Sequence, residues 1–138
     1  MRIRHYHPGD REQVVALWNH VFPRAAGHND PNASIDRKVA SDDDLFFIAV
    51  DEDAVIGTVM AGYDGHRGWL YSVAVDPGRR RCGIGSTLIR HVEQVLKELG
   101  CPKLNLQILA DNADVVAFYR SLGFQIEPRI SMGKIFAR

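Results

Sequence analysis

The stretch of sequence that decides the fold is YSVAVDPGRRRCGIGSTL, residues 71–88. It is typical of a strand, a short turn rich in arginine and glycine, and then a helix. Backbone N–H groups at the start of a helix have no internal partners, and the helix dipole favours negative charge there. Glycine lets a ligand approach the backbone, and arginine adds a permanent positive charge. The stretch therefore predicts a site for a phosphorylated ligand at the start of this helix.

Length and composition fit one soluble domain over residues 1–138. Of the 138 residues, 46% are hydrophobic and 25% are charged, with 17 basic and 17 acidic side chains. A formal net charge of zero argues against broad nucleic-acid binding. The longest apolar run, Leu45 to Val50, is too short to span a bilayer, and the first residues lack the apolar core of a signal peptide. We therefore expect no nucleic-acid partner and no membrane insertion.

The cysteines give no sign of a metal site or a disulfide framework. Only Cys82 and Cys101 are present, and their spacing matches neither pattern. We therefore expect no bound metal and a reducing, cytoplasmic location.

Apolar periodicity and turn residues predict alternating strands and helices. The predicted strands are Met1–Tyr6, Leu45–Val50, Ala54–Tyr63, Trp69–Val75, Lys103–Leu109, Phe124–Ile126 and Ser131–Phe136. The predicted helices are Arg11–Phe22, Ser34–Ala40, Ile84–Leu99, and one that begins at Asp111 or Asn112 and runs to Leu122. The order is β-α-α-β-β-β-α-β-α-β-β, which predicts an α/β fold with one mixed sheet and helices packed on it.

Two common phosphate-binding motifs do not fit the central turn. A dinucleotide-binding fingerprint needs a third glycine at position 88, which is Leu88. A P-loop needs Gly-Lys-Ser or Gly-Lys-Thr, and the chain contains neither tripeptide.

The order of residues around the turn resembles the GNAT superfamily of acetyl-CoA-dependent N-acetyltransferases. Residues 75–77, Val-Asp-Pro, followed by Arg-Arg-Cys-Gly-Ile-Gly at 80–85, match its Gln/Arg-x-x-Gly-x-Gly/Ala motif. Asn112, then Phe-Tyr at 118–119 and Ser-Leu-Gly-Phe at 121–124, match its second signature. A shorter match around residues 62–68 resembles its small bacterial YpeA-type subgroup. The resemblance implies a mostly antiparallel central sheet that is splayed at the acyl-CoA strand.

The resemblance implies that acetyl-CoA is the co-substrate and delivers its acetyl group to a primary amine. The expected acceptor is a small metabolite, a peptide N-terminus or a protein lysine. The pantetheine arm would pair with the backbone of the strand before the turn. The pyrophosphate would lie on the amides of the turn, and Arg79 or Arg81 could meet the 3′-phosphate. The implied cofactor-binding residues are Val73, Ala74, Val75, Arg80, Arg81, Cys82, Gly83, Ile84, Gly85, Ser86 and Asn112. The family usually has glycine at the position of Arg81.

The resemblance also implies a general acid, Tyr119, which would protonate the departing CoA thiolate. Packing on the apolar face of its helix is the alternative role for this ring. Asn112 fits a helix cap as well as a contact to the pantetheine arm. Some relatives carry a catalytic glutamate where this chain has Gln107, and no residue here is assigned as the base. Gln107 therefore keeps a second interpretation open, a non-catalytic module that binds acyl-CoA and regulates another process.

The remaining expectations concern the acceptor and the assembly. By analogy with such folds, the loop from Pro23 to Pro31, with Trp18 and His28, is expected to shape the acceptor pocket. A water relay of the proton to His66, Asp64 or a backbone carbonyl is the open alternative for the base, and His66 itself fits a solvated hairpin turn better. A homodimer is compatible with terminal strands that pair across subunits.

Overall fold

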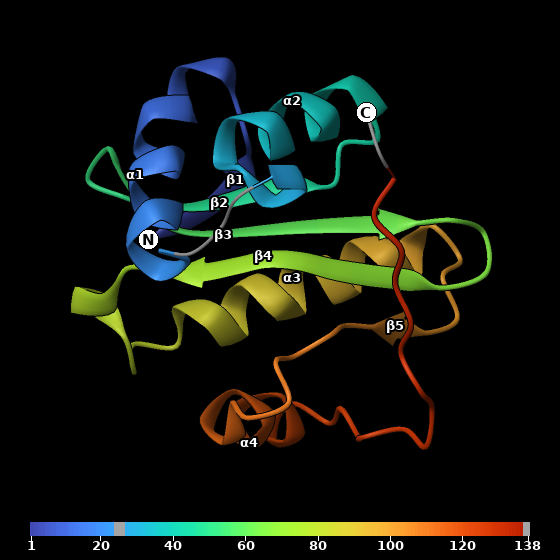
Figure 1. Ribbon diagram of the computed structural model, residues 1–138. Helices are drawn as coiled ribbons and strands as arrows, with labels where there is room; N and C mark the ends of the chain where they lie inside the picture. Colours follow the sequence, from blue (N-terminus) through green and yellow to red (C-terminus); the bar gives the residue numbers. More distant parts are fainter. Residues whose placement is uncertain (24–26, 137–138) are drawn as a thin grey trace. The chain divides into compact units, whose positions relative to one another are not determined.

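Figure 1 shows the computed structural model, which describes residues 1–23 and 27–136. The strands are β1 (Arg2–His5), β2 (Phe46–Asp51), β3 (Ala54–Tyr63), β4 (Gly68–Val75) and β5 (Leu104–Asn105). The helices are α1 (Arg11–Val21), α2 (Pro31–Ser41), α3 (Ile84–Glu98) and α4 (Ala113–Ser121), with short 3-10 turns at Pro8–Asp10, Gly27–Asn29 and Pro77–Arg79. The chain divides into two compact units, Met1–Gln107 and Ile108–Arg138. The single domain expected over residues 1–138 stays a prediction.

The first unit is built on a five-stranded sheet in the order β1-β2-β3-β4-β5. Neighbouring strands are antiparallel from β1 to β4, and β4 and β5 are parallel. The β4–β5 pairing contains only Gly68 opposite Leu104 and Trp69 opposite Asn105. The sheet therefore opens along β4 after Trp69, which agrees with the expected splay.

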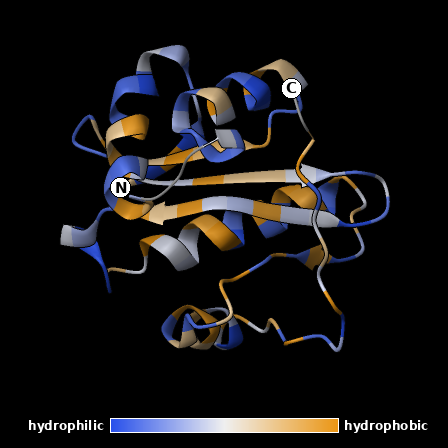
Figure 2. Cartoon of the chain, viewed as in Figure 1, coloured by the Kyte–Doolittle hydropathy of each residue, from blue (hydrophilic) through white to orange (hydrophobic). Residues whose placement is uncertain are grey.

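Helices cover both faces of this sheet (Figure 1). Successive side chains of a strand point to opposite faces, so neighbours in β2 contact different helices. Phe46 stacks with Trp18 of α1 at a centroid distance of 5.9 Å. Phe47 makes an edge contact with His91 of α3 at 4.6 Å. Figure 2 shows hydrophobic residues along the strands and on parts of the helices. The core between α1, α2 and the sheet includes Val14, Leu17, Trp18, Ile35, Phe46, Ile48, Val50, Val55, Met60 and Ala74.

The position of α3 depends on one glycine of β3. The buried stripe of α3 comprises Ile84, Leu88, Ile89, Val92 and Leu96. A Cβ added at Gly57 would lie 2.9 Å from Leu88 Cδ1 and 3.1 Å from Ile84 Cγ2. These contacts are tighter than most real Cβ contacts, so a side chain at Gly57 would require the ends of the Leu88 and Ile84 side chains to shift.

The structure confirms the predicted fold class, and most element boundaries agree within a few residues. The last part of the chain differs. The strand predicted over Lys103–Leu109 is reduced to β5, and the strands predicted at Phe124–Ile126 and Ser131–Phe136 are absent from the described residues 124–136. A strand needs hydrogen bonds to a neighbouring strand, and an apolar pattern does not supply that neighbour. Ile130 and Phe136 are 91% and 84% exposed, so their pattern does not mark a buried face.

The second unit contains α4, which begins and ends with the residues that the sequence indicated. Asn112 caps the helix, and Gly123 has a φ of 95°, a conformation that glycine adopts without strain. Tyr119 packs against Phe118 and Phe124, with centroid distances of 5.0 and 5.5 Å.

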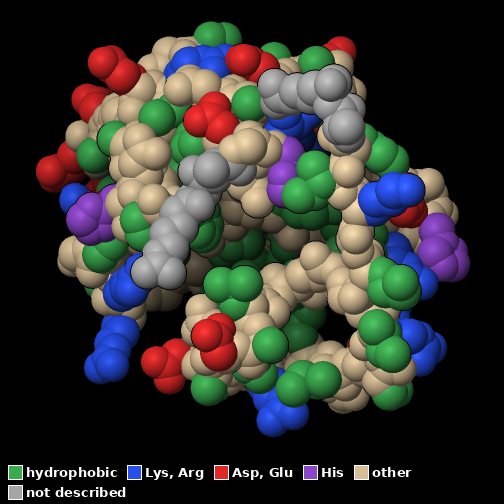
Figure 3. All heavy atoms as spheres, in the orientation of Figure 1, with side chains coloured by type: hydrophobic (Ala, Val, Ile, Leu, Met, Phe, Trp, Pro, Cys, Tyr) green, Lys and Arg blue, Asp and Glu red, His purple; other side chains and the backbone are tan. Residues whose placement is uncertain are grey.

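Charges of both signs are distributed over the face of the molecule shown in Figure 3, which agrees with the balanced composition. None of the helices in the described part of the chain is long and apolar enough to cross a membrane.

Candidate functional site

The first feature of the site is a bulge in β4. Thr58 pairs with Ala74 and Met60 pairs with Tyr71, so β4 advances by three residues where β3 advances by two. The extra residue lies at Ser72–Val73, and Ser72 has a φ of +50°. This left-handed conformation costs an L-residue about 1–2 kcal/mol. Bulges are enriched next to active sites, because they redirect the backbone and end regular pairing.

The second feature is the open edge of β4 beyond Trp69. Asp76 N–H donates to the Ile56 carbonyl at 2.8 Å, so this residue faces β3. Backbone groups alternate in direction along a strand, and the N–H and carbonyl of Val75 therefore point away from β3. Ala74 is paired with Thr58 on β3, and its side chain is buried. The edge can pair with the backbone-like amides of an extended ligand.

The third feature is the turn that leads from β4 into α3. Arg81 and Gly83 both have left-handed backbones, with φ values of 66° and 76°. Gly83 is the N-cap of α3, and no side chain caps this helix. The N–H groups of the first turn, on Ile84, Gly85 and Ser86, therefore have no partner within the helix. Cys82 is exposed between the two left-handed residues. The chain thus presents a row of amides that suits an anion.

The arginines of this turn are not equivalent. Arg79 Nη1 lies 2.5 Å from Asp51 Oδ2, and the N-terminal amine lies 3.6 Å from the other oxygen of that carboxylate. The Arg79 guanidinium holds the pKa of Asp51 below its ordinary value. Arg80 and Arg81 are exposed, and within residues 1–23 and 27–136 neither forms an ion pair. Between Arg79 and Arg81, the geometry favours Arg81 as the residue that is available for a phosphate.

The second unit carries the two remaining predicted site residues on one helix. Asn112 Oδ1 accepts a hydrogen bond from Val115 N–H at 3.3 Å, so the cap predicted for this residue is present. Tyr119 is 7% exposed, and burial raises the pKa of its phenol to about 12. The phenol is therefore protonated throughout the neutral range.

The residues around the β3–β4 turn are engaged in local structure. Asp64 Oδ1 accepts hydrogen bonds from the backbone N–H groups of Arg67 at 2.9 Å and His66 at 2.8 Å. These bonds lower the pKa of the Asp64 carboxyl, which makes it a weaker base. Tyr71, within β4, is half exposed, and burial together with the charge of Asp64 raises its pKa. The described residues contain no group of three or more His, Cys, Asp or Glu side chains placed to hold a metal ion.

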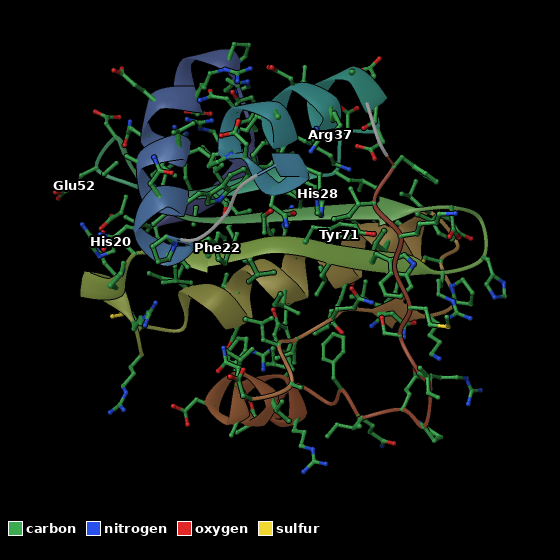
Figure 4. All side chains as sticks on the ribbon, viewed as in Figure 1. His20, Phe22, His28, Arg37, Glu52 and Tyr71 are labelled. Carbon is green, nitrogen blue, oxygen red and sulfur yellow. The ribbon has the colours of Figure 1, made fainter. Side chains whose placement is uncertain are left out.

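The segment expected to shape the acceptor pocket is described only in part, because residues 24–26 lie outside the described residues. Figure 4 shows Phe22 and His28 on the α1–α2 connection and Tyr71 on β4. Arg37 of α2 donates a hydrogen bond to the His28 carbonyl. Trp18 differs from the expectation, because it is 2% exposed and packs in the core. Its size and periodic position fit a buried helix face, and it does not line an open pocket.

Sequence reasoning missed three residues that shape this site. Gly57 allows α3 to approach the sheet, Asp51 engages Arg79, and Thr58 contacts the bulge. A glycine within a predicted strand is a signal of close backbone approach, so Gly57 could have been found. The roles of Asp51 and Thr58 depend on contacts between distant segments and have no local signal.

The comparisons with known proteins agree with this geometry. The family model described as the acetyltransferase (GNAT) family matches residues 11–124. The chain belongs to the GNAT acetyltransferase family. An acetyltransferase of Yersinia enterocolitica is 40% identical to it, over 97% of this chain and 94% of the relative.

Solved structures show the same GNAT fold. An aminoglycoside N-acetyltransferase in complex with CoA has a TM-score of 0.79 at 20% identity, with 99% of this chain and 95% of that chain covered. Ard1 from Thermoplasma volcanium has a TM-score of 0.80 at 23% identity, with 91% and 83% covered. These likenesses show that the chain has the GNAT fold along nearly its whole length.

Proposed function

We propose that this GNAT protein is an N-acetyltransferase that moves an acetyl group from acetyl-CoA to a primary amine. One observation carries the proposal: the bulged, open edge of β4 leads directly into the uncapped start of α3. A ligand with an amide-bearing arm and a diphosphate would use both features at once. CoA is such a ligand, and a solved relative with this fold contains it.

Each part of acetyl-CoA has an assigned partner in this proposal. The pantetheine arm lies along β4 at Val73, Ala74 and Val75 and pairs with backbone groups that point away from β3, those of Val75 among them. The pyrophosphate lies on the amides from Arg81 to Ser86, with Arg80 at the first motif position, and Arg81 is proposed to meet the 3′-phosphate. Asn112 adds a contact to the pantetheine arm beside its role as a cap. Charge-assisted hydrogen bonds to phosphate are short and strong, so the turn is proposed to supply most of the affinity.

The reaction is a direct transfer. The lone pair of a neutral amine attacks the thioester carbon, a C–N bond forms, and the C–S bond breaks as its electron pair moves to sulfur. A β4 amide stabilises the negative charge on the thioester oxygen while the amine attacks. Tyr119 gives its phenolic proton to the thiolate and then regains a proton from the solvent. The ammonium formed by the attack loses its proton to water.

The proposed acceptor class follows from the family. Solved structures with this fold include an aminoglycoside N-acetyltransferase and a glucosamine-6-phosphate N-acetyltransferase. Their names share transfer to nitrogen and differ in the rest of the acceptor. A primary amine on a small metabolite, a peptide N-terminus or a lysine is therefore the class we assign.

A second candidate function is a regulatory module that binds acyl-CoA without turning it over. One observation favours it, the amide of Gln107 at a position where some relatives have a catalytic glutamate. An amide does not take the proton that the acceptor ammonium must lose before the neutral amine can attack.

Two measurements test both candidates. Titration calorimetry with acetyl-CoA, CoA and ATP is expected to show binding of the first two and none of ATP. Thiol release from acetyl-CoA is then followed across polyamines, amino acids, aminoglycosides and lysine peptides. Release with an amine supports the transferase, binding without release supports the regulatory module, and no binding of acetyl-CoA contradicts both.

A further inference from the structure

A buried chain of hydrogen bonds connects α1 to the bulge of β4. Trp18 Nε1–H donates to Thr58 Oγ1 at 2.8 Å, and the Thr58 hydroxyl donates to the Ser72 carbonyl at 2.9 Å. Trp18 is 2% exposed and Thr58 is fully buried. The chain joins residues that are 40 and 14 positions apart in the sequence, so it fixes three separate elements relative to one another.

The chemistry of the three groups fixes the direction of this chain. An indole N–H only donates, so Thr58 Oγ1 must accept from Trp18. The single proton of the hydroxyl is then directed to the Ser72 carbonyl, which only accepts. Among the natural residues, serine is the closest replacement that keeps both bonds, while valine has nearly the same shape and keeps neither.

The chain of hydrogen bonds ends at Ser72, the residue that carries the backbone strain of the site. Ser72 has a φ of +50°, and it lies between the pairs Thr58–Ala74 and Met60–Tyr71, where the register shifts. Backbone conformations of this kind persist only where the surrounding structure determines them. A buried hydrogen bond is strengthened by its low-dielectric surroundings and becomes costly when one partner is removed. Thr58 therefore supplies the contact that holds Ser72 in place.

We infer that Trp18 and Thr58 are positioning residues for acetyl transfer, which hold the β4 bulge in the shape that directs its amides at the thioester. This inference rests on the function proposed above. Neither side chain touches the co-substrate, because both are buried in the core. Their effect passes through the backbone of Ser72 to the residues that follow it on β4. Small errors in the placement of reacting groups reduce turnover strongly, so a shift of the bulge affects kcat more than affinity.

Three variants separate this role from a general contribution to stability. Thr58→Val keeps the volume and removes both hydrogen bonds, Trp18→Phe removes the indole N–H together with part of the ring volume, and Thr58→Ser keeps both hydrogen bonds. Ile35→Val is the matched control, because Ile35 is fully buried in the same core and is not part of the chain.

The kinetic readout uses acetyl-CoA and an amine that the acceptor panel identifies. Thr58→Val is expected to lower kcat about 30-fold, with the Kd for CoA changed by less than about threefold. Trp18→Phe is expected to lower kcat by about fivefold, because Thr58 can still donate to Ser72. Thr58→Ser and Ile35→Val are expected to stay within about threefold of the unaltered protein.

A structural readout keeps this inference separate from the proposed function. The crystal structure of Thr58→Val is expected to show Ser72 at a negative φ and an altered register between β3 and β4. Such a change supports the role of Thr58 in the bulge, even where the amine panel gives no turnover and the proposed transferase fails. If Thr58→Val does not fold, the kcat of Trp18→Phe decides, and a value equal to that of the unaltered protein overturns the inference. An unchanged bulge with unchanged kcat in the folded variants overturns the inference.

Discussion

The helices α3 and α4 begin in opposite ways. Asn112 closes the start of α4 with its own side chain, at 3.3 Å from Val115 N. Gly83 precedes α3 and offers no side chain, so the first-turn amides of that helix stay open. Both helices have the same four N–H groups to satisfy. The difference fits the roles proposed above, in which α3 binds CoA with its backbone and α4 acts through the Tyr119 side chain.

The α2 helix strengthens this comparison. Asp30 Oδ2 accepts a hydrogen bond from Ala33 N–H at 3.1 Å, so α2 is capped like α4. The α1 helix also begins without a side-chain cap bond, because the carboxylate of its N-cap residue Asp10 is held by Arg4 and by His7 N–H. What distinguishes α3 is that its N-cap residue is a glycine, which has no side chain that could cap the helix. An aspartate or asparagine cap accepts hydrogen bonds from the first N–H groups of a helix in the free protein. A glycine at this point leaves those amides available to a ligand.

The largest effect is expected from the side chain that α4 contributes. Tyr119→Phe keeps the ring and removes the phenolic proton, so kcat is expected to fall about 100- to 1000-fold. The Kd for acetyl-CoA is expected to change by less than about twofold, because the proton acts only as the thiolate leaves. Steady-state kinetics and calorimetry measure the two quantities.

The pH profile adds a second check on Tyr119. Its pKa of about 12 means that the phenol does not ionise below about pH 11. The unaltered protein is therefore expected to show no loss of kcat from phenol ionisation up to pH 10. Equal turnover of Tyr119→Phe and the unaltered protein across pH would remove this residue from the mechanism.

The next largest effect is expected from a substitution that places a charged side chain at the open start of α3. Gly83→Asp places a carboxylate at the start of the helix, where it opposes the CoA diphosphate. The Kd for CoA is expected to rise about 100-fold, because two like charges a few ångströms apart repel strongly in this partly desolvated setting. Calorimetry at two salt concentrations measures the change.

Gly83→Asn is the matched control for this substitution. Asparagine tolerates the left-handed backbone that Gly83 adopts at a φ of 76°, and it carries no charge. Its Kd is expected to rise by less than about tenfold. If the two variants bind CoA equally well, charge at the start of α3 does not govern binding.

These two helices also show what can be predicted from the sequence. The α4 helix is flanked by Asn112 and Gly123, and the α3 helix by glycines at 83 and 100, as local turn and cap chemistry requires. The apolar stripe of α3 and the splayed sheet were also confirmed. Local signals sufficed for the helix ends and the apolar stripe, because each depends on neighbours in the sequence, whereas the splay was expected from the resemblance to the GNAT family.

The features that could not be predicted depend on contacts between distant segments. The Thr58 hydroxyl meets Ser72 only after β3 and β4 have paired with a shifted register. The alternation of residues 131–136 resembles a strand, yet the structure forms no strand there, because a strand requires a neighbour that alternation does not specify.

A smaller effect is expected at Arg81, within the open turn of α3. Its left-handed backbone, at a φ of 66°, costs an L-residue about 1–2 kcal/mol. Arg81→Gly removes this strain and adds some entropy to the unfolded chain, so the free energy of unfolding is expected to rise by up to about 1 kcal/mol. The lost guanidinium is expected to raise the Kd for CoA about tenfold. Thermal unfolding is therefore expected to show improved stability, while calorimetry is expected to show reduced affinity for CoA.

Two controls, the ligand dephospho-CoA and the variant Arg79→Gln, test whether Arg81 contacts the 3′-phosphate. Without the 3′-phosphate, Arg81→Gly and the unaltered protein are expected to have Kd values within about twofold of each other. Arg79 is engaged by Asp51, so Arg79→Gln is expected to bind CoA normally. Equal loss of affinity for both ligands would contradict a 3′-phosphate contact at Arg81.

The smallest effect is expected at the capped start of α4. Asn112→Ala removes the bond to Val115 N and is expected to lower the free energy of unfolding by about 1 kcal/mol, or roughly 3 °C in Tm. Asn112→Ser keeps a capping oxygen and loses the longer amide, so it separates the cap from a contact to the pantetheine arm. If the cap is the main role, the serine variant recovers both Tm and CoA affinity. If the serine variant recovers only Tm and the Kd for CoA stays several-fold higher, the Asn112 amide also binds the ligand, and the contrast between the two helices is one of degree.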